Sequence, residues 1–569
     1  MVKLVPSVQV DWQQVRQRTR SLQAWKLPKE PSSVAPPGVA SNKDQDPVPI
    51  HLRTWTAWDY AAYWMSDLIN ATTWQIASSA MLVGLSTTDA IAIAALSAIL
   101  NALPTVLCGF PGTDYHIPFP ISIRATYGYY FSNFCVLSRA LLGAVWFGVN
   151  CYYGLFIVTE IIAAIWPSYR NLPNHLPASS YMTTQQFVSY IIFVLVQFPF
   201  QLIPVHKLKK LFLIKAILMP PVSIAMVIWI CVKAGNTKAI FSQPATVTGS
   251  ARAWLWLSTL SSSTNAWLSS TINMSDFTRF SKTKRGPWAM APTIPIVRTV
   301  YAILGVAMAG AGQELYGKLL WNPIECLSLW TGSGGRFLSF CAGCLWLLAQ
   351  ISTNISANSA PFGHDAMNLS PKWINVRRGS VICMLIGSWA MVPWLLVNTA
   401  SKFLTFMNSY GSFVAAMVGV AMCDYLLVRR RKLDVPGLYD PHGRYRYIAG
   451  INIRAAVVQF FFMGICIPGV VNNINATIPV PEGFKRLFAI NWFVNTLGPI
   501  VAYWALYKVW PDRKSLVSQP IYGVAVVDGA DSDSQSAADH EKAGEEGDSK
   551  LGKAQVVEKS IDMHVSNTV

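Results

Sequence analysis

Long apolar stretches alternate with short polar segments along most of the chain. Each apolar stretch is long enough for an α-helix to cross the hydrocarbon core of a bilayer. The pattern therefore predicts an all-α polytopic membrane protein with twelve transmembrane helices. The predicted spans cover residues 56–84, 88–110, 134–165, 187–204, 211–234, 253–273, 291–312, 336–360, 379–399, 404–428, 448–470 and 487–509.

Basic residues gather in every second loop. Cytosolic loops of membrane proteins carry an excess of Lys and Arg, so this alternation places both termini in the cytosol. A missed span would invert the alternation downstream, and it persists through span ten. The basic residues after spans four, six, eight and ten are Lys207, Lys209, Lys210, Arg279, Lys282, Lys284, Arg285, Lys372, Arg377, Arg378, Arg429, Arg430, Arg431 and Lys432.

Composition agrees with a membrane location. Of the 569 residues, 52% are hydrophobic and 13% are charged, about half the charged share of a soluble protein. The net charge of +17 sits in short loops rather than on a basic face of a soluble domain, which argues against nucleic acid as a partner.

The two ends of the chain differ from the middle. Residues 1–53 are polar and rich in proline, and residues 511–569 end in an acidic segment with few aromatic side chains. Both compositions are typical of disordered tails, so we expect a transporter domain over residues 54–510 between them. The acidic tail carries Lys542, Lys550, Lys553 and Lys559 and would suit a ubiquitin ligase or an arrestin-type adaptor; a simple solvated tail is the alternative.

Spans one and six contain polar groups that are costly in lipid. Asp67 and Asn70 lie near the middle of span one, and span six reads LSSSTNAWLSSTINMSDFTRF. Such groups mark functional positions, and broken helices at positions one and six are typical of transporters built from two five-helix repeats of opposite orientation. Asp67 and Asn70 are therefore candidates for cation binding or coupling.

Span eight contains the polar run AQISTNISANS. Ala349, Ser352 and Thr353 share one helix face, and two hydroxyls with freed carbonyls suit a monovalent cation such as sodium. On an ideal helix Asn358 lies opposite Ala349, so we expect it to face a substrate instead. The alternative is hydrogen bonding between helices, which explains one or two polar residues better than seven.

Span three contributes Trp146 and Asn150, one helical turn apart, and span six contributes Trp267. Indole faces and carboxamides suit a planar, hydrogen-bonding heterocycle, because rings stack and amides read donor and acceptor edges. The alternative for each Trp is packing or an interfacial belt, since the chain has 22 of them.

Enzyme chemistry has little support. Paired catalytic carboxylates, metal-ligand spacings and a nucleophile elbow are absent from the sequence, and its histidines lie outside the predicted spans. We therefore expect no catalytic residues, no cofactor and no metal other than sodium at the cation site.

Several motifs together resemble the nucleobase–cation symporter family one, in its fungal uracil, allantoin, uridine and thiamine permease branch. They are TAWDYAAYWMSD at span one, WFGVN in span three, NMSDFTRF after span six, AQISTNISAN in span eight and GVAMCDYLLVRRRKLDVPGLY from span ten. The resemblance covers roughly residues 50–510. It implies a leucine-transporter-like 5+5 inverted repeat followed by two C-terminal helices, working by alternating access.

The resemblance also implies roles. Trp146 and Trp267 would stack on the substrate, Asn150 and Asn358 would read it, and Ala349, Ser352 and Thr353 would form the cation site. Two positions depart from the family: Asn150 stands where Gln is usual, and Trp267 stands where fungal uracil and allantoin carriers often have Lys. Both departures place uracil itself in doubt.

The expected protein is thus a plasma-membrane symporter. It would import a small planar nitrogen heterocycle (nucleobase, allantoin, nucleoside or related vitamin) with a proton or a sodium ion, and we favour the proton. A transport-incompetent nutrient sensor of the same fold is the alternative. Asn475-Ala476-Thr477 is a glycosylation sequon in a loop expected outside.

Overall fold

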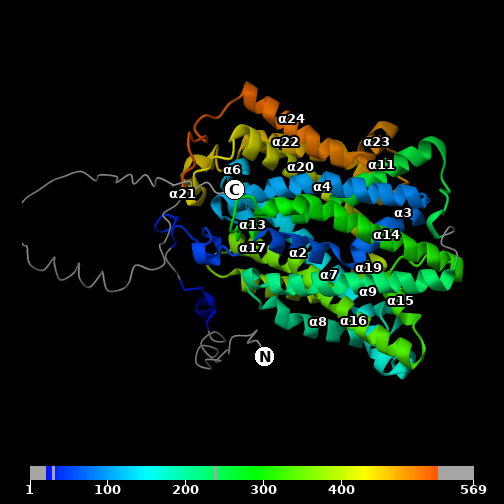
Figure 1. Ribbon diagram of the computed structural model, residues 1–569. Helices are drawn as coiled ribbons and strands as arrows, with labels where there is room; N and C mark the ends of the chain where they lie inside the picture. Colours follow the sequence, from blue (N-terminus) through cyan, green and yellow to red (C-terminus); the bar gives the residue numbers. More distant parts are fainter. Residues whose placement is uncertain (1–20, 29–31, 236–239, 523–569) are drawn as a thin grey trace, which may run out of the picture. The chain divides into compact units, whose positions relative to one another are not determined.

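The computed structural model describes residues 21–28, 32–235 and 240–522, which are almost entirely helical (Figure 1). Short 3-10 helices precede the first long helix, and the described residues form only isolated β-bridges. The first part of the bundle comprises α2 (Ala57–Leu68), α3 (Ala71–Leu82), α4 (Thr87–Tyr115), α5 (Phe119–Ser122), α6 (Arg124–Tyr127), α7 (Ser132–Ile165), α8 (Thr184–Gln201), α9 (Lys209–Ala234), α11 (Gly249–Asn265), α12 (Leu268–Ile272) and α13 (Ser275–Thr278).

The second part contains three π-helices within or at the ends of long helices. It comprises α14 (Met290–Tyr316), α15 (Pro323–Ser328), α16 (Gly332–Asn354), the π-helix η8 (Ile355–Ser359), α17 (Ala360–Leu369), α18 (Val376–Leu385), the π-helix η9 (Ile386–Ala390), α19 (Pro393–Thr399), α20 (Ser401–Met422), the π-helix η10 (Cys423–Val428), α21 (Val435–Tyr439), α22 (Ile453–Ile474), α23 (Glu482–Ala489) and α24 (Asn491–Val509).

Each predicted span corresponds to one helix or to consecutive helical pieces. Among the described residues, seven helices are long and apolar enough to cross a membrane, and an eighth span results if the bent pair 376–390 and 393–399 is counted as one. The other four predicted spans are the broken pairs α2–α3 and α11–α12 and the shorter helices α8 and α24. The architecture is consistent with the twelve-span prediction.

Spans one and six are both interrupted. In span one, α2 ends at Leu68 and α3 begins at Ala71; in span six, α11 ends at Asn265 and α12 begins at Leu268. These are the two spans whose polar side chains predicted a break. Polar side chains make a break tolerable in lipid because they replace the hydrogen bonds that the helix loses.

Close backbone contact holds span nine against span three. A Cβ atom at Gly148 would lie 2.3 Å from the carbonyl oxygen of Gly387, which belongs to η9. Only glycine permits this approach. The wide π-turn therefore packs directly on the α7 backbone, next to the residues that the sequence marked in span three.

The N-terminal segment is ordered further than its composition predicted. Residues 32–53 were expected to belong to a disordered tail, but the backbone of Val48 donates to the carbonyl of His116, and Asn42 Nδ2 donates to the carbonyls of Pro371 and Ile374. Tyr439 donates to the carbonyl of Gln45 at 2.6 Å. These contacts provide partners for the polar residues that a composition argument treats as solvated.

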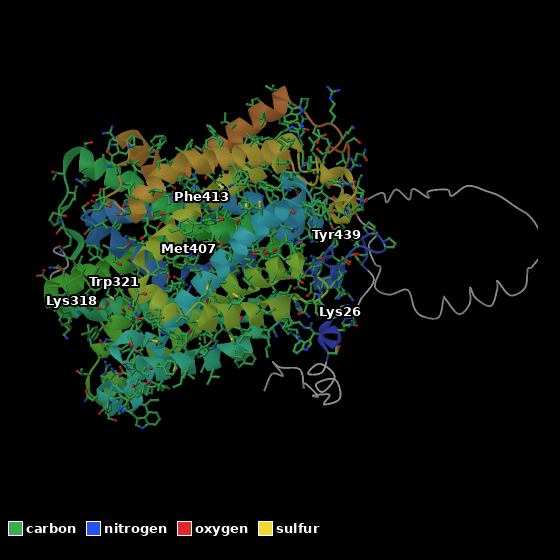
Figure 2. All side chains as sticks on the ribbon, turned by 180° about the vertical axis from the view of Figure 1, so that it is seen from behind. Lys26, Lys318, Trp321, Met407, Phe413 and Tyr439 are labelled. Carbon is green, nitrogen blue, oxygen red and sulfur yellow. The ribbon has the colours of Figure 1, made fainter. Side chains whose placement is uncertain are left out.

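This N-terminal segment defines one end of the bundle, which we call the docking end. Figure 2 shows Lys26 and Tyr439 at the docking end and Lys318 and Trp321 at the far end. Residues 511–522, expected in the C-terminal tail, also pack there: the backbone N–H of Val435 donates to the carbonyl of Ile521 at 2.9 Å. The acidic segment with Lys542, Lys550, Lys553 and Lys559 lies outside the described residues.

His116 joins three segments at the docking end, just beyond α4. Its Nδ1 donates to the carbonyl of Arg279 at 2.8 Å, and Arg279 donates to the carbonyl of Asp44 at 2.8 Å. Burial lowers the pKa of His116 to about 4, and the nearby Arg53 acts in the same direction. The imidazole is therefore neutral in the folded protein over most of the physiological range.

This shift predicts a loss of stability in acid. The unfolded chain binds a proton at His116 below about pH 6.5, whereas the folded protein does so only near pH 4. Stability that this group provides at neutral pH is thus lost as the pH falls from about 6.5 towards 4. The variant His116→Asn, which tolerates the left-handed φ of +57°, should show a smaller fall in Tm between pH 7.5 and pH 5 in detergent. Equal falls in the two proteins would contradict this assignment.

Candidate functional site

Asn70 occupies the break in span one. Its Oδ1 accepts from the backbone N–H of Thr73 at 2.8 Å, which caps α3, and its Nδ2 donates to the carbonyl of Asp67 at 2.5 Å. One carboxamide therefore provides partners for both helix ends, where the helix leaves backbone groups free. Asn70 is placed to hold the break open rather than to coordinate an ion directly.

Asp67 lies at the same break and is fully buried. Its Oδ1 accepts from the hydroxyl of Ser356, and its Oδ2 has no hydrogen-bond partner among the described residues. The hydroxyl of Ser66, the residue before Asp67, lies 3.1 Å from the hydroxyl of Ser352, which precedes Ser356 by one helical turn. Span one and span eight are thus joined through a carboxylate and hydroxyls, and one carboxylate oxygen remains available.

The expected cation site faces span five and contains a lysine. Lys215, fully buried on α9, donates from its Nζ to the carbonyl of Ala349 at 3.0 Å and to the hydroxyl of Thr353 at 2.7 Å. Lys215 and Asp67 thus both contact span eight, through Thr353 and through Ser356. Two of the oxygens expected to bind a free cation therefore already bind an ammonium group that belongs to the chain.

Sequence reasoning missed Lys215, although a signal was present. Lys215 is an ionisable residue inside an apolar span, in the run LFLIKAILM. Such residues mark functional positions by default. It lies inside predicted span five, residues 211–234, apart from the loop residues Lys209 and Lys210, and was assigned no role.

A second face of span eight contacts span three. Gln350 Nε2 donates to the backbone carbonyl of Asn150 at 2.9 Å and to its Oδ1 at 3.0 Å. Asn150 Nδ2 in turn donates to the carbonyl of Trp146 at 2.9 Å. The Asn150 carboxamide thus folds back along its own helix and is held from both sides.

Asn358 lies two turns further along this face. Its Nδ2 donates to Oδ1 of Asn354 at 2.9 Å. Asn354 Nδ2 donates to the carbonyl of Phe147 at 3.3 Å and to Gln197 on α8 at 3.0 Å. Gln350, Asn354 and Asn358 are spaced at i, i+4 and i+8 and therefore share one face of span eight, and η8 keeps this order.

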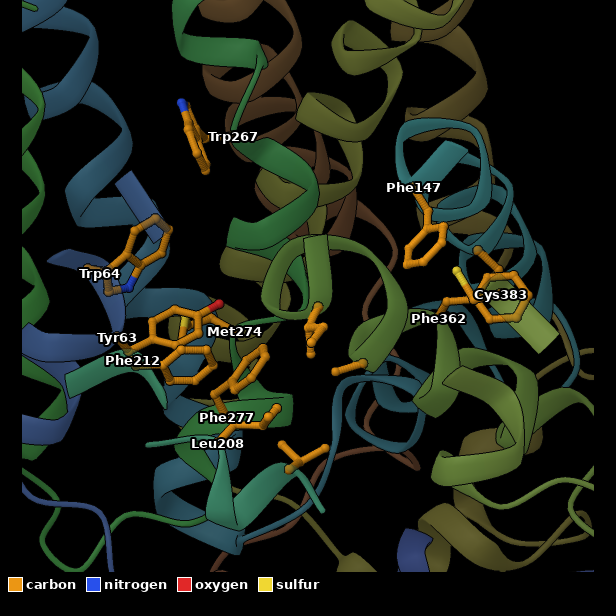
Figure 3. Close-up of a cluster of buried hydrophobic side chains, with 14 of the residues drawn as sticks. Tyr63, Trp64, Phe147, Leu208, Phe212, Trp267, Met274, Phe277, Phe362 and Cys383 are labelled. Carbon is orange, nitrogen blue, oxygen red and sulfur yellow. The ribbon is translucent and has the colours of Figure 1, made fainter. Parts of the chain in front are cut away.

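Trp267 forms the break in span six, where its φ and ψ of −108° and 1° are not helical. Its ring centroid lies 6.4 Å from that of Trp64 on α2, and both indoles lie on the same side of the close-up in Figure 3, with Phe147 on the other. The Nε1 of Trp267 has no hydrogen-bond partner among the described residues. Trp267 therefore contacts span one. Trp146, Asn150 and Asn358 instead take part in the hydrogen bonds of spans three and eight.

No group of three or more His, Cys, Asp or Glu side chains is arranged to hold a metal ion among the described residues. The side chains available are instead the indoles of Trp146 and Trp267, the carboxamides of spans three and eight, the amine of Lys215 and the carboxyl group of Asp67. These groups can stack on a ring, read its edge and bind or release a proton.

Sequences similar to this chain are those of permeases. Residues 47–495 match the family model described as permease for cytosine/purines, uracil, thiamine and allantoin. An uncharacterised permease of Schizosaccharomyces pombe is 33% identical, with 84% of this chain and 86% of the relative covered. The uracil permease of Saccharomyces cerevisiae is 31% identical, with 83% of this chain and 76% of the relative covered.

Solved structures share the fold. Mhp1, a nucleobase-cation-symport-1 family transporter solved in a closed conformation with bromovinylhydantoin bound, superimposes with a TM-score of 0.64 at 17% identity, covering 83% of this chain and 98% of Mhp1. A sodium-coupled sialic acid symporter gives a TM-score of 0.50 at 14% identity, covering 83% of this chain and 93% of its own. The fold is therefore leucine-transporter-like, as expected.

The cap at the break in span one provides a test of the geometry. Asn70→Ala removes the acceptor for the Thr73 N–H, whereas Asn70→Ser keeps a side-chain oxygen at this position, and both lose the bond to Asp67. Asn70→Ala should therefore be less stable than Asn70→Ser by about 1 kcal/mol, seen as a lower Tm of the purified protein in detergent. Equal Tm values for the two variants would show that Asn70 does not act as a cap.

Proposed function

Because this chain belongs to the family of permeases for cytosine/purines, uracil, thiamine and allantoin, we propose that it is a secondary active symporter that imports a small planar nitrogen heterocycle. The chain is a multi-pass membrane permease and not an enzyme. Alternating access would operate at the two broken spans, where interrupted helices place polar groups inside the bundle.

One observation carries the substrate proposal: carboxamides of spans three and eight form two hydrogen-bonded pairs, Gln350 with Asn150 and Asn358 with Asn354, inside an apolar bundle. A structural role alone needs few such groups, since each bond between helices contributes only about 0.6 kcal/mol. In the proposed site Trp146 and Trp267 stack on the ring, and Asn150 and Asn358 bind its edge.

The range of relatives supports a heterocycle without selecting one. Relatives with 30–31% identity include permeases of Saccharomyces cerevisiae named for uracil, allantoin, uridine and nicotinamide riboside. These names share a nitrogen heterocycle. The substrate class therefore covers nucleobases, allantoin, nucleosides and related vitamins.

For the coupling ion we propose the proton. Sodium at the span-eight site would have to bind Ala349 and Thr353, whose oxygens accept from Lys215. An ammonium at this distance would repel a second cation strongly in the low dielectric of the bundle. A proton can instead be exchanged by Lys215 or by the nearby Asp67, which alters the same contact between spans one, five and eight without a separate ion.

The proposal includes location and partners. The basic loops gather towards the docking end, so we place this end and both termini in the cytosol of a cell, with the permease in the plasma membrane. The acidic tail would then be accessible to a ubiquitin ligase or an arrestin-type adaptor.

Uptake in cells lacking endogenous permeases tests the function. Cells with this chain should accumulate a radiolabelled heterocycle above its external concentration, and a protonophore should abolish this accumulation. Asn358→Ala and Trp267→Ala, compared at equal surface level, should each lower substrate affinity by about tenfold or more. A nutrient sensor would bind substrate without accumulation, and a channel would equilibrate it without concentrating it.

Lys215 should be required for proton coupling. Lys215→Met removes the ammonium while keeping a long side chain, so accumulation driven by a pH gradient should fall by at least about tenfold. Lys210→Met, on the same helix but exposed, is the matched control and should transport normally. Protonophore-sensitive accumulation at the control level in Lys215→Met would exclude coupling through this lysine, and stimulation of wild-type uptake by sodium would contradict the choice of ion.

A further inference from the structure

Span seven contains a buried guanidinium group that the proposed site does not use. Arg298 lies about two turns into α14 and is only 1% exposed. Its Nη2 donates to the backbone carbonyl of Ser263 at 2.5 Å. Its Nε and Nη1 have no hydrogen-bond partner among the described residues, and no carboxylate of those residues forms an ion pair with it. The carbonyl of Ser263 is therefore the one partner that the described part of the chain provides for this side chain.

Ser263 lies in the last turn of α11, directly before the break in span six. In a continuous helix its carbonyl would accept from the backbone N–H of Trp267, four residues later. The helix ends instead at Asn265, and the carbonyl accepts from Arg298. A positive charge is favourable here, because the carbonyl end of a helix carries a partial negative charge. Arg298 thus replaces the backbone donor that is lost where Trp267 leaves the helix.

The two broken spans differ in the origin of this replacement. In span one, Asn70 belongs to the break itself and binds groups from both helix ends. In span six the donor comes from span seven and is a charged group, although burying a charge is costly. The geometry of the break in span six consequently depends on where span seven lies.

The same face of α14 also contacts both indoles. Met290, Ile294 and Arg298 are spaced at i, i+4 and i+8, so they share one face of the helix. Met290 and Ile294 belong to the apolar cluster that contains Trp64 and Trp267. The Nε1 of Trp64 donates to the sulfur of Met290 at 3.0 Å. One face of span seven thus holds Trp64 directly and also holds the helix end that leads into Trp267.

We propose that Arg298 is a positioning residue for the substrate: it fixes the end of α11 and thereby the place of the Trp267 indole that stacks on the ring. This inference rests on the proposed function, in which Trp267 contacts the substrate, and it adds a residue that acts through Trp267. Without the guanidinium, the carbonyl of Ser263 loses its donor, and the end of α11 shifts or rewinds to find another. Either movement displaces the indole from the ring.

A double-mutant cycle tests whether Arg298 acts through Trp267, because residues that act as a unit give non-additive effects. The probes are radiolabelled uracil, allantoin, uridine, nicotinamide riboside and thiamine, for which relatives are named. The probe that is taken up best is then used to measure binding to the purified full chain, so that slower transport does not hide a change in affinity.

Arg298→Met keeps a long side chain without donors and should weaken binding by at least about threefold. In Trp267→Ala, whose affinity is expected to be lower from the start, the same substitution should change binding by less than about twofold. Equal weakening in both backgrounds, or no weakening in the wild-type background, would overturn the inference while leaving heterocycle transport intact. Absence of uptake and binding of all five probes would instead overturn the proposed function, and this inference with it.

Arg336→Met is the matched control for a merely structural role. Arg336 also donates to the last carbonyls of a helix, those of Ala164 and Ile165 at the end of α7, at 2.9 and 2.7 Å. Its substitution should lower the Tm and leave the affinity for the probe unchanged. If Arg298→Met does not reach the membrane, the cycle is run with Arg298→Gln, which keeps a polar group but neither the charge nor the reach, and the same outcomes decide.

Discussion

A polar group inside a bilayer has no water to bind, so its partners must come from within the protein's own bundle. Asn70 meets this constraint at the break in span one, where a single carboxamide binds groups from both helix ends. The constraint also explains the fully buried ion pair of Arg139 with Asp365, at 2.8 Å. The break in span one is stabilised by a side chain of the same span, and the Arg139 charge is stabilised by Asp365 from a different helix.

This requirement links the moving parts that alternating access needs. Asp67 on span one and Lys215 on span five both reach span eight, through Ser356 and through Thr353. A change in protonation of either group alters a contact between helices rather than an isolated charge. The expected cation site and the structural contact between spans are here one arrangement, so in the proposed mechanism Lys215 bears on both coupling and stability.

The hydropathy pattern was sufficient to predict the helices, because lipid imposes one length and one composition on every span. The breaks at Asn70 and Trp267 were also predictable, since polar residues in the middle of a span are too costly in lipid to lie there without a role. Docking of residues 32–53 was not, because most of its hydrogen bonds join a polar side chain to a backbone carbonyl that is far away in the sequence. Lys215 was visible inside predicted span five but was assigned no role. The π-helix η8 itself was not predictable, because its hydrogen-bond pattern is a property of the backbone that side-chain spacing does not reveal.

The departure at Asn150 follows from the same network. Sequence resemblance leads one to expect Gln at this position, and Asn is shorter by one methylene. The shorter carboxamide reaches the carbonyl of Trp146 on its own helix, and Gln350 holds its oxygen. The orientation of the Asn150 carboxamide thus depends on Gln350 and Trp146. In the proposed site, the length of this side chain would set how far the ring lies from span three, and with it the size of ligand that this position admits.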